Sequence, residues 1–502
     1  MGRQISWGEV QGHDKEKDVW IIVNGQVFDM TGFAPEHPGG AEIIYQHAGK
    51  DASEAYNEVH SPNLIRKHLE ESCHVGTFDA STLPAKTSTS QVDNPASAVK
   101  AIASNTTQST LQPGSGNGKP FLDEIINLED FRRAAQQSFS PKAWAYIAGA
   151  SYDNYTRDAN QEMLRRIWLR PAVMRDVSVV DTTTTLFGCR LSMPVYISPT
   201  GAVKMAGPEG ELAQAKGAAA TGIIQCFSTP ASYPHEEILE VTPERAFFQL
   251  YVNKDRAKSE EMIRTVTAAG KVKAIFVTVD CPVISKREDD ERVASNAAAA
   301  TATATARAGR DKKGAGLTRQ ASSFIDSTLS WKDVEWLRRI TDLPIVVKGL
   351  QRWEDAVIAL RHGCDGIVIS NHGGRAADTT QPSILTLLEL RRNCPQVFDR
   401  MKVLVDGGFR RGSDVLKAIC LGASAVGIGR PFMFAVNYGQ EGVEHLVTLL
   451  HDELKTTMQL CGMTQLMREA SPNYINTRDI DHLVPGMQTP LQGVAEGAKS
   501  KL

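Results

Sequence analysis

The stretch PIVVKGLQRWEDAVIALRHGCDGIVISNHGG (344–374) places two apolar runs, at 344–349 and 366–374, on either side of a helix-like segment. Runs that are apolar throughout are typical of parallel strands whose two faces are both covered. Similar runs recur at 194–201, 222–228, 247–252, 274–280, 402–408 and 425–431. Eight such strands alternating with helices predict a (β/α)8 TIM barrel. The alternative, an open doubly wound sheet, lacks the Gly-x-Gly-x-x-Gly turn expected after its first strand.

The composition excludes several functional classes. A chain of 502 residues is longer than one ordinary domain, so we expect two or more. It is 42% hydrophobic and 23% charged, which is typical of soluble globular proteins, and no apolar run is long enough to span a bilayer. The net charge of -3 creates no strong field for nucleic acid or anionic membranes. The eight cysteines form no Cys-x-x-Cys pair, which argues against structural zinc or disulfides and favours a reducing compartment.

Two low-complexity segments divide the chain. Residues 81–118 are rich in Ser, Thr, Pro, Gly and Asn, so they predict a flexible linker between a small unit (1–80) and a large one (119–485). Residues 289–323 include an Ala-Thr-rich stretch without an apolar face, which predicts a mobile surface loop within the large unit. Residues 486–502 form a C-terminal tail.

Polar residues gather where the predicted strands end. In a barrel these ends form one mouth, the face at which active sites lie. A single polar strand end could be a structural cap, but eight at one mouth indicate a site. They are Thr200, Ser228, Tyr251, Asp280, Lys348, His372, Asp406 and Arg430.

Two kinds of chemistry are indicated at this mouth. The Gly-rich turns VDGGFRRG (405–412) and GIGRP (427–431), with Arg410 and Arg430, suit a phosphate, although tight turns with solvated arginines are the alternative. Lys348, buried at a strand end, needs an anionic partner.

In SNHGGR (370–375), His372 is a candidate base, Arg375 could bind a carboxylate, and Asp280 could hold the imidazolium. Tyr251 adds a hydroxyl. A structural histidine that shapes the turn is the alternative.

At these residues the chain resembles the family of FMN-dependent 2-hydroxy-acid dehydrogenases and oxidases. The motifs ISPTG, FFQLYVNKDR, VTVDCP, LPIVVKG, SNHGGR, VDGGFRRGSDVLKA and GIGRPF occur in the family's order between residues 121 and 463. The resemblance implies FMN and a set of contacts to it. The flavin ring and its polar edge would contact Pro199, Thr200, Gly201, Ser228, Gln249, Thr278, Lys348 and Ser370, and the phosphate would contact Asp406, Gly407, Gly408, Phe409, Arg410, Gly429 and Arg430.

The resemblance also implies roles around the substrate. Arg375 and Tyr146 would bind the carboxylate of a 2-hydroxy acid, and Tyr251 would lie near its hydroxyl. His372 would be the base, backed by Asp280, with Arg287 as a further cation, and the product would be a 2-oxo acid. The chain departs from the common family pattern at Ile147, Gly201 and Pro230 and in the stretch GGRAAD (373–378). Gly201 and Pro230 predict room for a bulkier acid than lactate, such as mandelate.

The small unit carries a second candidate site. The His-Pro-Gly-Gly turn fixes His37 and allows a flat ligand to approach, and His60 could face it across an iron. His47 and His68 are rival partners. Nearly the whole unit resembles the α+β cytochrome b5 family, which implies haem b with His37 and His60 as axial ligands.

The two resemblances together match the flavocytochrome b2 type of L-lactate dehydrogenase. This arrangement implies oxidation of an L-2-hydroxy acid, lactate by default, with electrons passing to FMN, then haem b, then a cytochrome c-like acceptor, and it implies a homotetramer. The alternatives are an oxidase that reduces oxygen to hydrogen peroxide, and an electron carrier or haem sensor with an inactive barrel. Intact His372, Arg375, Asp280 and Lys348 argue against the last.

The chain ends in Ser500, Lys501 and Leu502, which match the peroxisomal import signal. Its first residues include acidic side chains and no apolar core segment, so they resemble neither a signal nor a transit peptide. We therefore expect a peroxisomal location. The alternative is the cytoplasm, with a chance match at the C-terminus.

Overall fold

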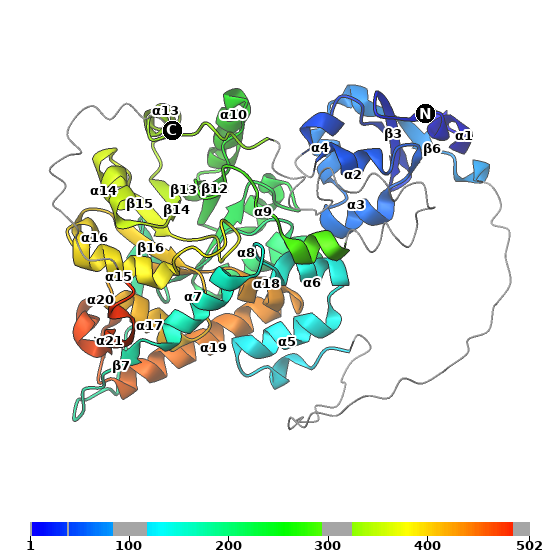
Figure 1. Cartoon of the computed structure of the whole chain (residues 1–502). Coiled ribbons are helices and arrows are strands. Elements are labelled where there is room, and N and C mark those ends of the chain that lie inside the picture. The colour runs from blue at the N-terminus through cyan, green and yellow to red at the C-terminus, as the bar shows by residue number, and fades with distance from the viewer. Residues whose placement is uncertain (1–2, 38–39, 84–117, 294–323, 485–502) are drawn as a thin grey trace.

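A computed structural model describes residues 3–37, 40–83, 118–293 and 324–484 (Figure 1). Most of the predicted linker (81–118) and mobile loop (289–323) lies outside the described residues. The predicted C-terminal tail (486–502), with Ser500, Lys501 and Leu502, lies outside them entirely.

The predicted TIM barrel is confirmed. Eight parallel strands close on themselves in chain order, and the first pairs with the last through Val195 opposite Val426. Each strand coincides with one of the eight apolar runs. The strands are β10 (Val195–Ile197), β11 (Ile224–Ser228), β12 (Ala246–Leu250), β13 (Val272–Thr278), β14 (Ile345–Leu350), β15 (Gly366–Ile369), β16 (Lys402–Asp406) and β17 (Ala425–Ile428).

Large aromatic side chains fill the barrel interior. Tyr196, Phe247 and Phe276 are each fully buried, and the rings of Phe247 and Phe276 stack with centroids 5.1 Å apart. These residues pack with smaller apolar side chains from the other strands into one cluster. The barrel is therefore a packed core, and its chemistry is confined to the ends of the strands.

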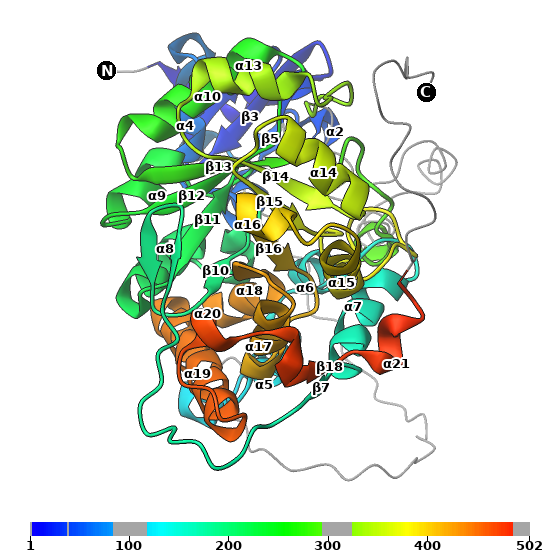
Figure 2. The same ribbon diagram turned by 90° about the vertical axis from the view of Figure 1, so that its left-hand side faces the viewer.

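Helices surround the barrel (Figure 2). They pack with their apolar residues toward the strands, which covers the second face of the sheet. The helices that follow the barrel strands are α8 (Gly210–Thr221), α9 (His235–Val241), α10 (Arg256–Ala268), α13 (Asp333–Ile340), α14 (Trp353–Arg361), α15 (Ser383–Asn393), α16 (Val397–Arg400), α17 (Gly412–Cys420), α18 (Arg430–Val436) and α19 (Gly439–Leu460).

Further elements precede and follow the barrel. Three helices come before it, α5 (Leu128–Ser138), α6 (Pro141–Ala148) and α7 (Tyr155–Arg165). The short strands β8 (Thr184–Leu186) and β9 (Cys189–Leu191) form a hairpin, and β7 (Trp168–Leu169) pairs with β18 (Ile475–Asn476) near the end of the described chain. Two short helices, α20 (Leu466–Glu469) and α21 (Arg478–Asp481), lie on either side of β18 in the sequence.

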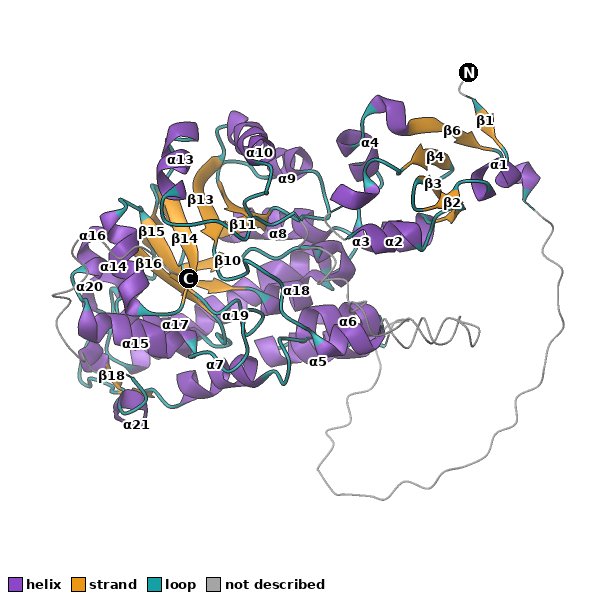
Figure 3. Ribbon diagram, turned by 45° about the horizontal axis from the view of Figure 1, so that its top comes forward, coloured by secondary structure: helices purple, strands orange, loops and turns teal. Residues whose placement is uncertain are grey.

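The small unit has its own mixed sheet and its own core (Figure 3). Short helices cover the sheet, and the loops between them carry His37 and His60. The strands are β1 (Gln4–Ile5), β2 (Asp14–Lys15), β3 (Asp18–Val23), β4 (Gln26–Asp29), β5 (Lys50–Asp51) and β6 (His74–Phe78). The helices are α1 (Trp7–Gln11), α2 (Ala41–Tyr45), α3 (Ser53–Val59) and α4 (Leu64–His68). The predicted α+β fold of this unit is confirmed.

Within the described ranges, no helix combines the length and apolar character needed to cross a bilayer.

Candidate functional site

The predicted base lies at the mouth of the barrel with its predicted partners. His372 follows β15, and its Nδ1 is 2.9 Å from Asp280 Oδ1 after β13. Tyr251 Oη, after β12, is 3.5 Å from Nε2 on the other side of the ring. The structure thus brings His372 together with two residues that lie 92 and 121 positions earlier in the chain.

The backbone of this loop is unusual. His372 has φ 58°, and Gly373 and Gly374 follow with φ 62° and 83°, so three successive residues are left-handed. A bulky residue is rarely found in this region, and such conformations concentrate at functional sites. The amide of His372 donates to Ser370 Oγ at 3.0 Å, which fixes the turn. The loop geometry therefore directs the imidazole between Asp280 and Tyr251.

The protonation states suit a base. Burial lowers the pKa of His372, while Asp280 acts to raise it, and the net pKa lies below the usual 6.5. For Asp280, burial opposes ionisation, but His372 and Lys348 hold the pKa of the carboxyl below its usual value. A neutral imidazole can donate from Nδ1 to the Asp280 carboxylate, which leaves Nε2 free to accept a proton.

Asp280, Cys281 and His372 also have the donor atoms of a metal site, since one ligand atom from each lies within 4.8 Å of the others. However, Lys348 and Arg287 lie close enough to lower the pKa of His372, so a cation would be repelled. We therefore interpret this cluster as an acid–base group.

A pH prediction follows from these shifts. A general base acts only in its unprotonated form, and the pKa of His372 lies below 6.5. We therefore expect kcat/KM to decline only below pH 6.5. Asp280→Asn removes a group that raises the pKa of His372, so the acidic limb should move to still lower pH. Initial rates measured across the pH range locate the acidic limb of the wild type and that of the variant. An acidic limb that moves to higher pH in this variant would contradict the assignment.

Lys348 lies in a buried ion pair beneath the same mouth. Its Nζ is 3.5 Å from Asp406 Oδ2 and donates to Ser370 Oγ at 3.2 Å. The two side chains are 4% and 8% exposed. Burial alone would lower the pKa of Lys348, but Asp406 and Asp280 raise it above its usual value. The lysine is thus a permanent ammonium, and Asp406 is the anionic partner that the sequence called for.

Replacing Lys348 with methionine is expected to cost about 3–5 kcal/mol in the barrel's free energy of unfolding, because it leaves buried carboxylates unpaired. Guanidinium unfolding of flavin-free protein measures this without a contribution from bound cofactor. The exposed Lys455→Met provides the matched control, with an expected change within about 0.5 kcal/mol. Equal stability of the two variants would show that the ion pair does not stabilise the barrel.

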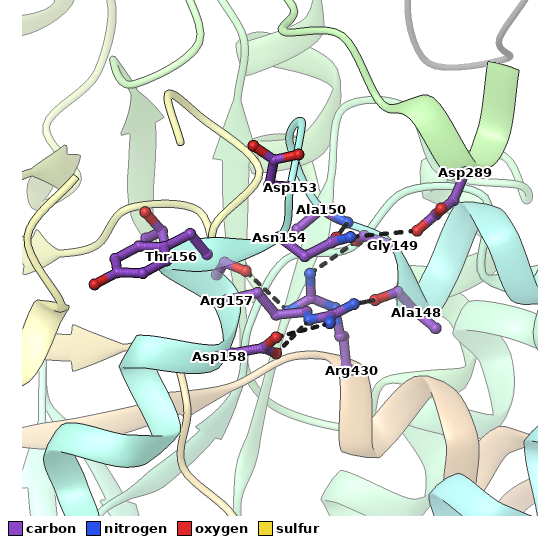
Figure 4. A network of polar contacts seen from close by, with 12 residues as sticks. Ala148, Gly149, Ala150, Asp153, Asn154, Thr156, Arg157, Asp158, Asp289 and Arg430 are labelled. Atoms are coloured by element: carbon purple, nitrogen blue, oxygen red, sulfur yellow. Dashed lines mark hydrogen bonds and ion pairs between the residues drawn. The ribbon is translucent and has the colours of Figure 1, made fainter. Parts of the chain in front are cut away.

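Three arginines at the mouth are held by backbone carbonyls. Within the described part of the chain, Arg375, Arg410 and Arg430 form no ion pair, and they donate to backbone carbonyls instead. Arg430, for example, donates to Gly149 O at 2.9 Å, beside Arg157, which donates to Ala148 O (Figure 4).

Burial lowers the pKa of Arg375 and of Arg410 to about 10, and that of Arg430 well below its usual value. Arg375 and Arg410 also repel Arg430. Concentrated, partly buried positive charge of this kind is stabilised by bound anions, so the mouth fits a phosphate and a carboxylate.

The predicted substrate contacts lie near Arg375. Its guanidinium donates to the carbonyl of Tyr146 and lies 5.2 Å from the centroid of the Tyr146 ring. Tyr146 Oη is 3.5 Å from Gly201 O. Arg287 is 5% exposed and close enough to lower the pKa of Arg375. The structure therefore gathers all the predicted substrate residues in one region.

The predicted flavin edge forms a chain of hydrogen bonds. Ser228 Oγ donates to Gln249 Oε1 at 2.5 Å, and Gln249 Nε2 donates to Thr278 Oγ1 at 3.0 Å. Thr200 Oγ1 and Asp406 Oδ1 are buried without a hydrogen-bond partner among the described residues. Such orphaned atoms fit a polar cofactor.

Three further residues predicted to contact FMN are Gly429, Pro199 and Phe409, and their surroundings differ. A Cβ at Gly429 would meet nothing closer than 3.8 Å, so the backbone there is open. Pro199 lies partly exposed at the end of β10. The ring of Phe409 is 1% exposed in the hydrophobic core, so its side chain does not face the mouth. The other predicted FMN contacts stay predictions.

The small unit brings together His37 and His60. Their ring centroids are 6.0 Å apart, a separation that allows a metal between two nitrogens with bonds of about 2 Å. His37 Nδ1 lies 3.1 Å from Gly40 O, which directs Nε2 toward His60. Burial lowers the pKa of His37, which favours the neutral form that binds iron. Phe33 and Tyr56 pack against the apolar core of this unit and lie beside His37 and His60, so apolar groups flank the two histidines.

Three supporting residues were missed by sequence reasoning. Cys281 Sγ lies 3.4 Å from His372 Nδ1 and flanks the acid–base pair. The side chain of Asn160 on α7 exchanges two hydrogen bonds with that of Asn371, at 2.9 and 3.0 Å. The backbone carbonyl oxygen of Asn160 lies so close to Gly408 that a Cβ there would be 2.5 Å from it. It therefore supports the histidine loop and the phosphate turn together. Glu211 on α8 is a buried carboxylate with no strand-end position to reveal it.

Comparisons with known proteins agree with this geometry. A family model described as FMN-dependent dehydrogenase matches residues 135–477, and one described as cytochrome b5-like heme/steroid binding domain matches residues 6–79. An L-lactate dehydrogenase (cytochrome) of Wickerhamomyces anomalus is 39% identical over 481 residues, 94% of this chain and 79% of that one. A peroxisomal (S)-2-hydroxyacid oxidase of Arabidopsis thaliana is 39% identical over 361 residues, 71% of this chain and 98% of that one.

Solved structures give the same result. A mutant flavocytochrome b2 with benzoylformate matches with a TM-score of 0.66 at 38% identity, over 76% of this chain and 95% of that one. The predicted resemblance to the flavocytochrome b2 type is thus confirmed, together with the FMN and haem that it implies. The chain belongs to the FMN-dependent dehydrogenase family and carries a cytochrome b5-like haem-binding domain ahead of its barrel.

Proposed function

We propose that this protein oxidises an L-2-hydroxy acid, lactate by default, to the 2-oxo acid and delivers the electrons to a one-electron acceptor. The observation that carries the proposal is the set of unpaired arginines beside the His372–Asp280 pair. When bound, FMN accepts the two electrons that leave C2, and haem b passes them singly to an acceptor.

The residues at the mouth can each contribute to this reaction. Arg375 and Tyr146 would hold the substrate carboxylate, which orients C2. His372 Nε2 would take the proton, and Asp280 at Nδ1 would stabilise the imidazolium that forms. Lys348 adds positive charge beside the FMN site.

The decisive experiment is an anaerobic stopped-flow mix of the purified protein with L-lactate, in which flavin and haem absorbance are followed together. Flavin bleaching followed by haem reduction supports the dehydrogenase. Flavin bleaching with haem left oxidised favours the oxidase. No change in either band rejects lactate, and mandelate is then tested in the same way.

An oxidase is the second candidate, because the Arabidopsis peroxisomal oxidase aligns with the barrel over nearly its whole length. Hydrogen peroxide yield per substrate oxidised distinguishes the two, since it is stoichiometric for an oxidase and low for a dehydrogenase. For the dehydrogenase we propose a cytochrome c-like acceptor and a homotetramer, which cytochrome c reduction assays and light scattering test.

We propose that the site also accepts acids with a larger side chain than that of lactate. A Cβ at Gly201 would lie 2.9 Å from Pro230 Cγ, so a side chain at position 201 would displace Pro230. A mutant flavocytochrome b2 was solved with benzoylformate, the oxo acid of mandelate. Gly201 adds no side chain at this position, which supports a bulkier acid such as mandelate. The ratio of kcat/KM for mandelate to that for lactate tests this, and Pro230→Leu should lower the ratio about 10-fold or more.

We also propose that Ser500, Lys501 and Leu502 direct the protein to the peroxisome, with the cytoplasm as the alternative. Attaching residues 490–502 to a fluorescent protein tests the signal. Punctate fluorescence that coincides with a peroxisomal marker supports it, and diffuse fluorescence rejects it.

A further inference from the structure

The segment that carries His60 rests on the mouth of the barrel. The amide of Ser61 donates to Ser232 O, in the loop between β11 and α9, at 2.9 Å. Lys204, on the short helix η5 (Val203–Ala206) after β10, donates from Nζ to Asn57 O at 2.6 Å and to His60 O at 2.7 Å. These are direct hydrogen bonds between the two units.

The position of Lys204 relative to α3 explains why the contact is specific. Helix α3 ends at Val59, and Asn57 and His60 belong to its last turn and its C-cap. Carbonyls in this turn have no partner within the helix and carry its partial negative charge. An ammonium that bonds two of them acts as a cap supplied by the other unit. It therefore fixes both the end of α3 and the residue proposed to bind iron.

One buried carboxylate holds the barrel side of this contact. Glu211 Oε1 accepts from the amide of Val203 at 3.1 Å and from the amide of Ser232 at 2.8 Å. Ser232 Oγ then accepts from the amide of Lys204 at 3.1 Å. Glu211 is 0% exposed, so this network is shielded from water. The two loops that meet the His60 segment are thus joined through a single side chain.

The same loops carry the proposed flavin and substrate contacts. The backbone amide of Ala202, which lies between Gly201 and Lys204 in the sequence, donates to Pro230 O at 3.1 Å. The docking contact is therefore continuous with the pocket, within a few residues along each loop. In contrast, the ion pairs Lys142–Glu58 and Lys67–Glu237 involve partly exposed side chains at the rim, where screening leaves them weak.

We propose that Lys204 and the Ser232 carbonyl form the docking surface for the haem-binding unit, with Glu211 as a positioning residue that holds the surface in shape. The proposal rests on the proposed function, in which the haem-binding unit receives electrons at the barrel mouth. Docking through the backbone of the His60 segment would set the orientation in which that transfer occurs.

Hydrogen exchange of the backbone tests docking without turnover. In Lys204→Met, the amide of Ser61 should exchange about 10-fold faster or more, because the loss of two charge-assisted hydrogen bonds lowers the docked fraction. Lys216→Met is the matched control, since Lys216 pairs with the exposed Glu209 and, among the described residues, forms no hydrogen bond or ion pair with the small unit. Equal exchange of Ser61 in wild type and Lys204→Met would overturn the proposal.

Anaerobic stopped flow provides the second readout. In Lys204→Met, flavin bleaching should remain within about 2-fold of wild type, whereas haem reduction should slow about 10-fold or more. Lys204→Arg should restore part of the rate, because a guanidinium can reach the same carbonyls. Glu211→Ala should reproduce the slow haem phase, and Glu211→Gln, which keeps one acceptor oxygen, should do so less.

The outcomes separate the two proposals. If flavin is not bleached by any 2-hydroxy acid even in wild type, the proposed function fails, while hydrogen exchange still tests docking. If flavin bleaches and haem reduction is unchanged in Lys204→Met, the docking proposal fails and the proposed function stands. Should Glu211→Ala fail to fold, the Lys204 variants and their control decide the matter alone.

Discussion

Replacing His372 with glutamine should slow reduction of the flavin by substrate about 10²–10⁴-fold, the usual contribution of a positioned base. Glutamine keeps a polar side chain of similar size beside Asp280 and Tyr251 but cannot accept a proton at neutral pH. FMN content should be unchanged, because His372 is not among the FMN contacts proposed above. The expected loss is therefore in the chemical step and not in assembly.

Single-turnover reduction of the flavin under anaerobic conditions measures this step directly. His362→Gln serves as the control, because His362 caps α14 and stacks on Trp331, away from the mouth. The control should reduce its flavin at the wild-type rate. A His372→Gln protein that retains more than about a tenth of the wild-type rate would show that another group takes the proton.

The barrel could be predicted from the sequence because buried parallel strands have a direct signature. Both faces of β14 and β15 are covered, so residues 345–347 and 366–369 are apolar in succession without alternation. The shared location of the polar residues at the strand ends could be predicted by the same reasoning. Since all eight strands point the same way, the polar residues that end them had to share one face.

What the sequence could not reveal depends on contacts between distant segments. Asn160 lies on an amphipathic helix and bonds Asn371, 211 positions further along the chain. Glu211 lies on an Ala-rich helix, and nothing in that pattern indicates that its carboxylate joins two loops. The docking contact of Lys204 joins residues separated by 144 positions. The left-handed backbone at His372 has no signature in composition either, apart from the two glycines that follow.

The choice of haem ligands shows the same limit. Spacing alone left His47 and His68 as rivals to His60, and only the family resemblance separated them. In the structure, His37 and His60 face each other because α3 and the turn after Ala34–Glu36 pack on opposite sides of one apolar cluster. That arrangement is a property of tertiary packing.

Replacing His37 with alanine should abolish stable haem binding while leaving the barrel active. A six-coordinate iron needs both imidazoles, and the loss of one opens the site to water and weakens retention of the group. The haem absorbance per chain should fall about 10-fold or more, in line with the loss of a metal ligand. Flavin reduction by the hydroxy acid should continue at the wild-type rate, since His37 contributes nothing to the barrel mouth.

His47→Ala is the matched control, because His47 lies in the same unit but not opposite His60. It should retain haem with an unchanged spectrum. His60→Ala should reproduce the loss seen with His37→Ala, which guards against a folding defect specific to one position, and circular dichroism of each variant reports whether the small unit remains folded. If the His37 variant is folded and keeps its haem with the spectrum of two axial imidazoles, the ligand pair is wrong. If haem is lost and acceptor reduction stops while flavin bleaching persists, the electrons leave the protein only through the haem that His37 and His60 bind.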